Sequence, residues 1–144
     1  MNWINRWETF AFAAAFFASL TALFGKMGIA NINSNLATFI RVCVVLLLIT
    51  PILFYFNQWQ RPAAIAGKTW VFLILSGVAT GLSWLCYYRA LQLGPVSKVA
   101  SIDKLSVALA ILLGILVLQE KFSWPVVVGG CLITLGAVVV AMFG

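Results

Sequence analysis

Five apolar stretches of about twenty residues each constrain this chain more than any other feature. They cover approximately residues 10–29, 36–56, 70–91, 96–118 and 124–143. An α-helix rises about 1.5 Å per residue, so a stretch of this length crosses a hydrocarbon core about 30 Å thick. Inside lipid the backbone must satisfy its own hydrogen bonds, which favours helices. We therefore expect an all-α integral membrane protein with five transmembrane helices.

The composition leaves little material for a soluble domain. Hydrophobic residues make up 64% of the 144 residues and charged residues 8%, and the mean hydropathy is +1.10. These values lie far from those of soluble domains. We expect one membrane domain over residues 1–144, in a multi-pass protein of the cell membrane, most simply the bacterial inner membrane.

Catalytic and metal-binding chemistry has little support. The chain contains no histidine, and its three cysteines lie in apolar runs without CxxC spacing. "GLSWL" lacks the last glycine of a nucleophile elbow, and "PAAIAGKT" has Pro62 where a phosphate loop needs its first glycine. The net charge of +6 is scattered, without the basic run that nucleic-acid binding favours. We expect no catalytic residues, no metal, no cofactor and no nucleic-acid partner.

Charged residues gather in one half of the predicted membrane region. Five crossings bring the ends of the first and third spans and the starts of the second and fourth spans to the same leaflet. The residues concerned are Lys26, Arg41, Arg89, Lys98, Asp103 and Lys104. At about 1.5 Å per residue, Arg41 lies roughly 8 Å inside its span and Asp103 roughly 12 Å beyond the Gly94–Pro95 turn.

Asp103 is the only carboxylate within a predicted span. An acidic residue at such depth costs about 2.5 to 3.5 kcal/mol and faces a bundle interior or a water-filled cavity with a partner. One interpretation is a fixed ion pair with Arg41 or Lys104 that ties the second and fourth spans together. The other is a polar pathway for an ion or substrate.

Helical spacing places further residues beside the predicted polar pathway. Ser106 shares a face with Asp103, and Ser101 lies beside Lys104. Along the third span a single stripe passes from small residues to aromatic ones, through Gly77, Gly81, Trp84 and Tyr88. Gly77 and Gly81 form a small-xxx-small pair that would let another helix approach closely. The candidate pathway residues are Arg41, Trp84, Tyr88, Ser101, Asp103, Lys104 and Ser106.

Several of these motifs resemble a known family. "TALFGKMGI", "ATFIRVCVVLLL" and the segment containing "YYRALQLG" and "KVASIDKLS" are similar to the repeat unit of the drug/metabolite transporter superfamily, the EamA-type domain. The resemblance covers almost the whole chain once, as in short, single-copy members. It implies one half of an inverted-repeat transporter, with a substrate site between two halves that opens alternately to each side. One copy cannot supply that symmetry, so an antiparallel homodimer is expected.

The distribution of Lys and Arg permits insertion in both orientations. Arg6, Arg61, Lys68 and Lys121 fall on the amino-terminal face, and Lys26, Arg89 and Lys98 fall on the other. Positive residues favour the cytoplasmic side, and so slight a bias is compatible with dual topology. It is also compatible with a single orientation in which the amino terminus is inside.

The expected function is secondary transport of a small polar metabolite by alternating access. Deep cations outnumber deep anions, since Arg41 and Lys104 stand against Asp103, which favours an anionic or zwitterionic substrate. The partners would be membrane lipid, the small-molecule substrate and a second copy. Two alternatives stay open: a flippase, or flippase subunit, for a polyprenyl phosphosugar lipid carrier, and a non-transporting membrane assembly partner.

Overall fold

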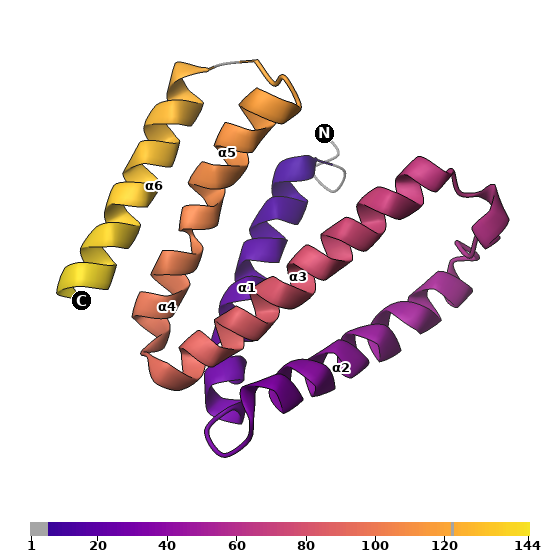
Figure 1. Ribbon diagram of the computed structural model, residues 1–144, viewed down its shortest axis with the longest axis horizontal. Helices are drawn as coiled ribbons and strands as arrows, with labels where there is room; N and C mark the ends of the chain where they lie inside the picture. The colour runs from indigo at the N-terminus through magenta and orange to yellow at the C-terminus, as the bar shows by residue number, and fades with distance from the viewer. Residues whose placement is uncertain (1–5, 122) are drawn as a thin grey trace. The chain divides into compact units, whose positions relative to one another are not determined.

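The computed structural model describes residues 6–121 and 123–144 (Figure 1). Its helices are α1 (Trp7–Gly28), α2 (Ser34–Tyr55), α3 (Gly67–Leu93), α4 (Val96–Asp103), α5 (Leu105–Val117) and α6 (Trp124–Phe143). A short 3-10 helix, Pro62–Ala64, lies in the connection between α2 and α3. Five helices are long and apolar enough to cross a membrane, with α4 and α5 together forming the fourth span. The predicted all-α fold with five transmembrane helices is confirmed.

The two ends of α2 show why the helix begins and ends where it does. The Asn33 side chain caps the first turn, because its Oδ1 accepts a hydrogen bond of 2.8 Å from the N–H of Asn35. At the other end, Asn57 has a φ of 52° and the Gln58 N–H donates to the Leu53 carbonyl at 2.9 Å. This is a Schellman motif, with asparagine in the left-handed position that glycine more often occupies.

Most apolar side chains of the spans point outward, because the solvent of this fold is hydrocarbon. In the most apolar stretch of each span, between 0% and 11% of the residues are buried inside the protein. Lipid tails solvate leucine and phenylalanine as well as a protein core does, so helix association relies on close packing and polar contacts instead. The few polar contacts within the spans therefore indicate which segments are held together.

The chain divides into two compact units, and Met27–Gln92 is one of them. It contains α2, nearly all of α3 and the loops at their ends, and the two helices run antiparallel (Figure 1). Its buried cluster consists of Ile29, Ala37 and Tyr88, with Tyr87 packed against it. The cluster joins the loop before α2, the first turn of α2 and the last third of α3.

The other unit combines the chain up to Lys26 with Leu93–Gly144. Both α4 and α5 pack against α6 within it (Figure 1). Gly130 of α6 is buried, and a Cβ added there would come 3.0 Å from the Cδ1 of Ile111. The Lys26 Nζ donates to the Gly94 carbonyl at 2.8 Å, which places a positive charge just beyond the carboxyl end of α3.

The fourth span is interrupted at Lys104, between α4 and α5. The Lys104 N–H donates to the Ser101 carbonyl at 3.1 Å, and the Val107 N–H donates to the Lys104 carbonyl at 3.0 Å. Hydrogen bonds of this three-residue spacing tighten the helix locally. The Ser106 hydroxyl donates to the Asp103 carbonyl at 2.6 Å. The sequence predicted one uninterrupted helix, since no glycine or proline marks the position of the break.

Candidate functional site

The guanidinium of Arg41 lies on the aromatic rings of α3. Its Cζ is 4.1 Å from the centroid of the Trp84 ring and 5.5 Å from that of Tyr88. The two rings share one face of α3 because they are four residues apart. At about 1.5 Å per residue, Arg41 stands roughly 10 Å from the start of α2. Three of the predicted pathway residues thus meet within the unit Met27–Gln92.

Packing holds this cluster in place. Tyr88 is 6% exposed and belongs to the buried cluster of its unit. Its ring also contacts that of Tyr87 edge to face, with centroids 6.5 Å apart. Arg41 and Trp84 are half-buried. Tyr88 therefore anchors the aromatic face, while the more accessible Trp84 carries the nearer contact to the cation.

No carboxylate compensates the Arg41 charge within its own unit. The stretch Met27–Gln92 contains neither Asp nor Glu, and the contacts of the guanidinium inside this stretch are ring faces. An arginine at the centre of a membrane helix costs about 2.5 to 3.5 kcal/mol. A cation–π contact returns about 0.5 to 2 kcal/mol of this. The ring contacts therefore offset only part of this cost.

Gly77 and Gly81 continue the stripe of Trp84 toward the amino end of α3. A Cβ added at either glycine would meet nothing within 4 Å. The helix predicted to pack against them therefore does not approach that closely in the described chain, and such packing stays a prediction. The stripe leaves open space along α3, one and two turns from Trp84.

Asp103 and Lys104 stand at the interruption of the fourth span. Their side chains form an ion pair, with 3.7 Å between the Lys104 Nζ and an Asp103 carboxylate oxygen; the Lys104 side chain is 55% exposed and the Asp103 side chain 42%. This contact matches one of the two pairings that the sequence left open. It is long, and it leaves the carboxylate accessible.

The two predicted serines lie around the same interruption. Ser101 is half-buried, and its carbonyl accepts the tightened hydrogen bond from Lys104. Ser106 is exposed and bonds to the carbonyl of Asp103 through its hydroxyl. The structure thus brings four of the predicted residues together at the break, as a second cluster in the other unit.

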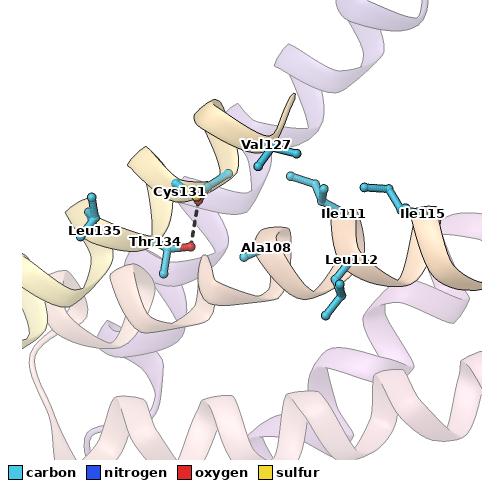
Figure 2. A pocket seen from close by; sticks show the side chains of 9 residues that line it. Ala108, Ile111, Leu112, Ile115, Val127, Cys131, Thr134 and Leu135 are labelled. Carbon is cyan, nitrogen blue, oxygen red and sulfur yellow. Dashed lines mark hydrogen bonds between the residues drawn. The ribbon is translucent and has the colours of Figure 1, made fainter. Parts of the chain in front are cut away.

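An apolar groove of about 670 Å³ lies between α5 and α6 (Figure 2). Ile111, Leu112 and Ile115 line it from α5, and residues including Thr134 line it from α6. The Thr134 hydroxyl donates to the Gly130 carbonyl at 2.8 Å, shown as the dashed line, so its proton is engaged within α6. The groove suits an apolar side chain or an acyl chain and offers little to a polar solute.

Gln92, which no sequence motif marks, ties the loop before α2 to the end of α3. Its Nε2 donates to the Ile32 carbonyl at 2.7 Å and to the Ile29 carbonyl at 3.5 Å. Its Oε1 accepts a 3.0 Å hydrogen bond from Arg89. One sequence feature could have predicted such a role: Gln92 is an amide in the last turn of an apolar helix, three residues after an arginine.

These helices and their few intramembrane polar groups define a multi-pass membrane protein. The model of the EamA-like transporter family matches residues 5–142. The chain therefore belongs to the EamA-like transporter family and is a membrane transporter, a class whose members are generally not enzymes.

Two relatives carry the word transporter in their names. "Uncharacterized transporter in cobO 3'region" of Sinorhizobium sp is 47% identical over 137 residues, which cover 95% of this chain and 97% of that protein. "Uncharacterized transporter YojE" of Bacillus subtilis (strain 168) is 28% identical over 104 residues, which cover 69% of this chain and 35% of that protein. No solved structure matches the chain.

Proposed function

We propose that this chain is a single membrane domain that acts as a secondary transporter of a small anionic or zwitterionic metabolite. The observation that carries the proposal is the Arg41 guanidinium, held 4.1 Å over Trp84 in a unit without a carboxylate. The ring contacts hold the guanidinium beside α3, and its N–H groups are donors that an anionic ligand could accept from. A substrate carboxylate or phosphate fits this geometry, because guanidinium groups bind both through paired hydrogen bonds.

Asp103 is the proposed coupling group. Asp103 lies within the fourth span, beside a single tightened turn at Lys104. Its carboxylate is paired with Lys104 at 3.7 Å and remains accessible. A proton that binds this carboxylate would release Lys104 from its partner. Proton binding and local charge are therefore linked at this position.

The proposed assembly is an antiparallel homodimer in which each copy serves as the inverted half of the other. The Sinorhizobium relative supports a functional unit of this size, because the alignment covers 97% of that protein. The matched part of YojE makes up 35% of its length, so a similar segment also occurs within a longer transporter. A topology reporter placed after Gly144 should read both sides of the membrane, and a reporter confined to one side would exclude this dimer.

The anion site is tested by ligand-induced stabilisation of the purified protein. A panel of carboxylate, phosphate, zwitterionic and cationic metabolites is screened by thermal shift against the wild type, Arg41→Gln and Lys121→Gln. A ligand at one hundred times its dissociation constant adds about 2.7 kcal/mol to stability. We expect hits among anions or zwitterions that Arg41→Gln abolishes and Lys121→Gln keeps, since Lys121 lies outside the spans. Cationic hits that survive Arg41→Gln would contradict the proposed site.

The coupling role requires a separate measurement. Uptake of the identified ligand into proteoliposomes is driven by an imposed pH gradient, with Asp103→Asn compared to Glu120→Gln. Glu120 lies in the loop between α5 and α6 and is the matched carboxylate outside the spans. Asp103→Asn should abolish gradient-driven accumulation while ligand binding at Arg41 persists. If Asp103→Asn accumulates ligand as the wild type does, Asp103 is not the coupling group.

A further inference from the structure

The connection between α2 and α3 combines exposed aromatic rings with the exposed cations Arg61 and Lys68. Aromatic residues crowd it and the adjoining helix ends, and their exposed fractions run from 40% for Trp70 to 85% for Tyr55. The rings are those of Phe54, Tyr55, Phe56, Trp59, Trp70 and Phe72. Because α2 and α3 both span the membrane, this connection emerges at one membrane surface. Tyrosine and tryptophan concentrate at the level of the lipid headgroups.

Internal contacts give the connection a defined shape. Trp59 folds back and stacks on Phe54, with ring centroids 5.4 Å apart and an interplanar angle of 8°. The Schellman motif at Asn57 makes this reversal of the chain. The Trp70 Nε1 donates to the Pro62 carbonyl at 3.3 Å and closes the far side over the 3-10 helix. The Trp59 and Trp70 rings are therefore positioned before any partner binds.

Two cations of this segment lack a carboxylate nearby in sequence. Arg61 and Lys68 are exposed, and the stretch Met27–Gln92 that contains them has no Asp or Glu. The Lys68 Nζ lies 6.0 Å from the centroid of the Phe72 ring. The contrast is with Arg6, which forms a 2.7 Å ion pair with Glu8. Arg61 and Lys68 thus present an uncompensated charge of +2 beside an aromatic surface.

We propose that this segment binds the phosphate headgroup of an anionic phospholipid. The rings insert at the headgroup level, where their apolar bodies leave water while their polar atoms stay hydrated. Arg61 and Lys68 then face lipid phosphates, which attract basic side chains at the membrane surface. A protein partner at the same place would need an acidic surface able to cover the rings. The bilayer already provides both components beside every copy of the chain.

The proposal is independent of the transport site, because it rests on different residues, those of the connection between α2 and α3. It is tested by native mass spectrometry of the full chain in detergent, titrated separately with phosphatidylglycerol and phosphatidylcholine. Each basic residue near a membrane surface contributes about fivefold to the binding of anionic lipid. The double variant Arg61→Gln with Lys68→Gln should weaken the first phosphatidylglycerol site at least tenfold and leave phosphatidylcholine binding unchanged.

Two matched variants separate charge from general damage. Arg61→Lys with Lys68→Arg keeps the charge and should retain phosphatidylglycerol affinity within about twofold. Lys121→Gln removes a cation that follows Glu120 and should likewise have an effect below about twofold. Circular dichroism verifies the fold of each variant, and the exposure of Arg61 and Lys68 makes a loss of fold unexpected. If the glutamine double variant keeps phosphatidylglycerol affinity within twofold, or if the wild type binds both lipids equally, the proposal fails.

Photocrosslinking then locates the contact. A benzoylphenylalanine in place of Trp59 should yield an adduct with the mass of phosphatidylglycerol in membranes that contain it. An adduct with the mass of a second chain would overturn the assignment and make this segment an interface between copies. The absence of any adduct, together with unchanged lipid affinity in the glutamine double variant, would also overturn it.

Discussion

The contact between Arg41 and Trp84 should be measurable as a coupling free energy of unfolding. The perturbation is a double-mutant cycle that combines Arg41→Met with Trp84→Leu, both of which keep apolar volume in the span. With the cation 4.1 Å from the ring centroid and both side chains half-buried, the contact lies between the exposed limit of about 0.5 kcal/mol and the desolvated limit of about 2 kcal/mol. We expect a coupling of about 1 to 1.5 kcal/mol.

The assay is unfolding in mixed micelles of dodecyl maltoside and sodium dodecyl sulfate, followed by circular dichroism so that the loss of a tryptophan does not affect the signal. The same cycle with Tyr88→Leu is the internal comparison, because that ring is farther from the cation, at 5.5 Å. Tyr88→Leu alone should destabilise more than Trp84→Leu alone, since Tyr88 is 6% exposed, yet its coupling to Arg41 should be smaller. A Trp84 coupling below about 0.3 kcal/mol, the level at which independent sites add, would refute the reasoning.

Two further substitutions test other contacts by thermal unfolding in detergent. Gln92→Leu should lower the free energy of unfolding by about 0.5 to 1.5 kcal/mol, because the 2.7 Å hydrogen bond to the Ile32 carbonyl is lost. An unchanged midpoint would mean that this bond contributes nothing. Gly77→Leu should not lower the free energy of unfolding by more than about 0.5 kcal/mol, because nothing lies within 4 Å of a Cβ at that position and leucine favours a helix more than glycine does. A larger loss in the monomer would reveal a helix packed there.

The membrane spans were predictable because the lipid bilayer restricts which backbone structures can cross it. A lipid-facing segment must close its own backbone hydrogen bonds, so length and hydropathy suffice to identify the five helices. The pathway residues could be proposed on similar grounds. A charge such as that of Arg41 is costly inside a span, and helical spacing put Trp84 and Tyr88 on one face. Which of these residues touch each other could not be derived from spacing within one helix.

Two features escaped prediction for local reasons. The tightened turn at Lys104 has no glycine or proline to announce it, and its hydrogen bonds to the Ser101 and Asp103 carbonyls are made by side chains and backbone groups that an ordinary helix also contains. Gln92 resembles any polar residue at a helix end. Its role arises because the Ile29 and Ile32 carbonyls, far from it in sequence, come within reach of its amide.

The sequence by itself determined that the chain lies in a lipid bilayer, how many times it crosses the bilayer, and which charged residues lie inside the spans, where they are energetically costly. These properties depend on the hydropathy of each segment and on the helical spacing of its residues, both of which can be read from one segment without the others. Only the tertiary structure decided that the Arg41 guanidinium lies 4.1 Å from the centroid of the Trp84 ring, and that the Gln92 amide reaches the Ile29 and Ile32 carbonyls. Such contacts join separate segments, and their free energies depend on distances of a few ångströms that no single segment specifies.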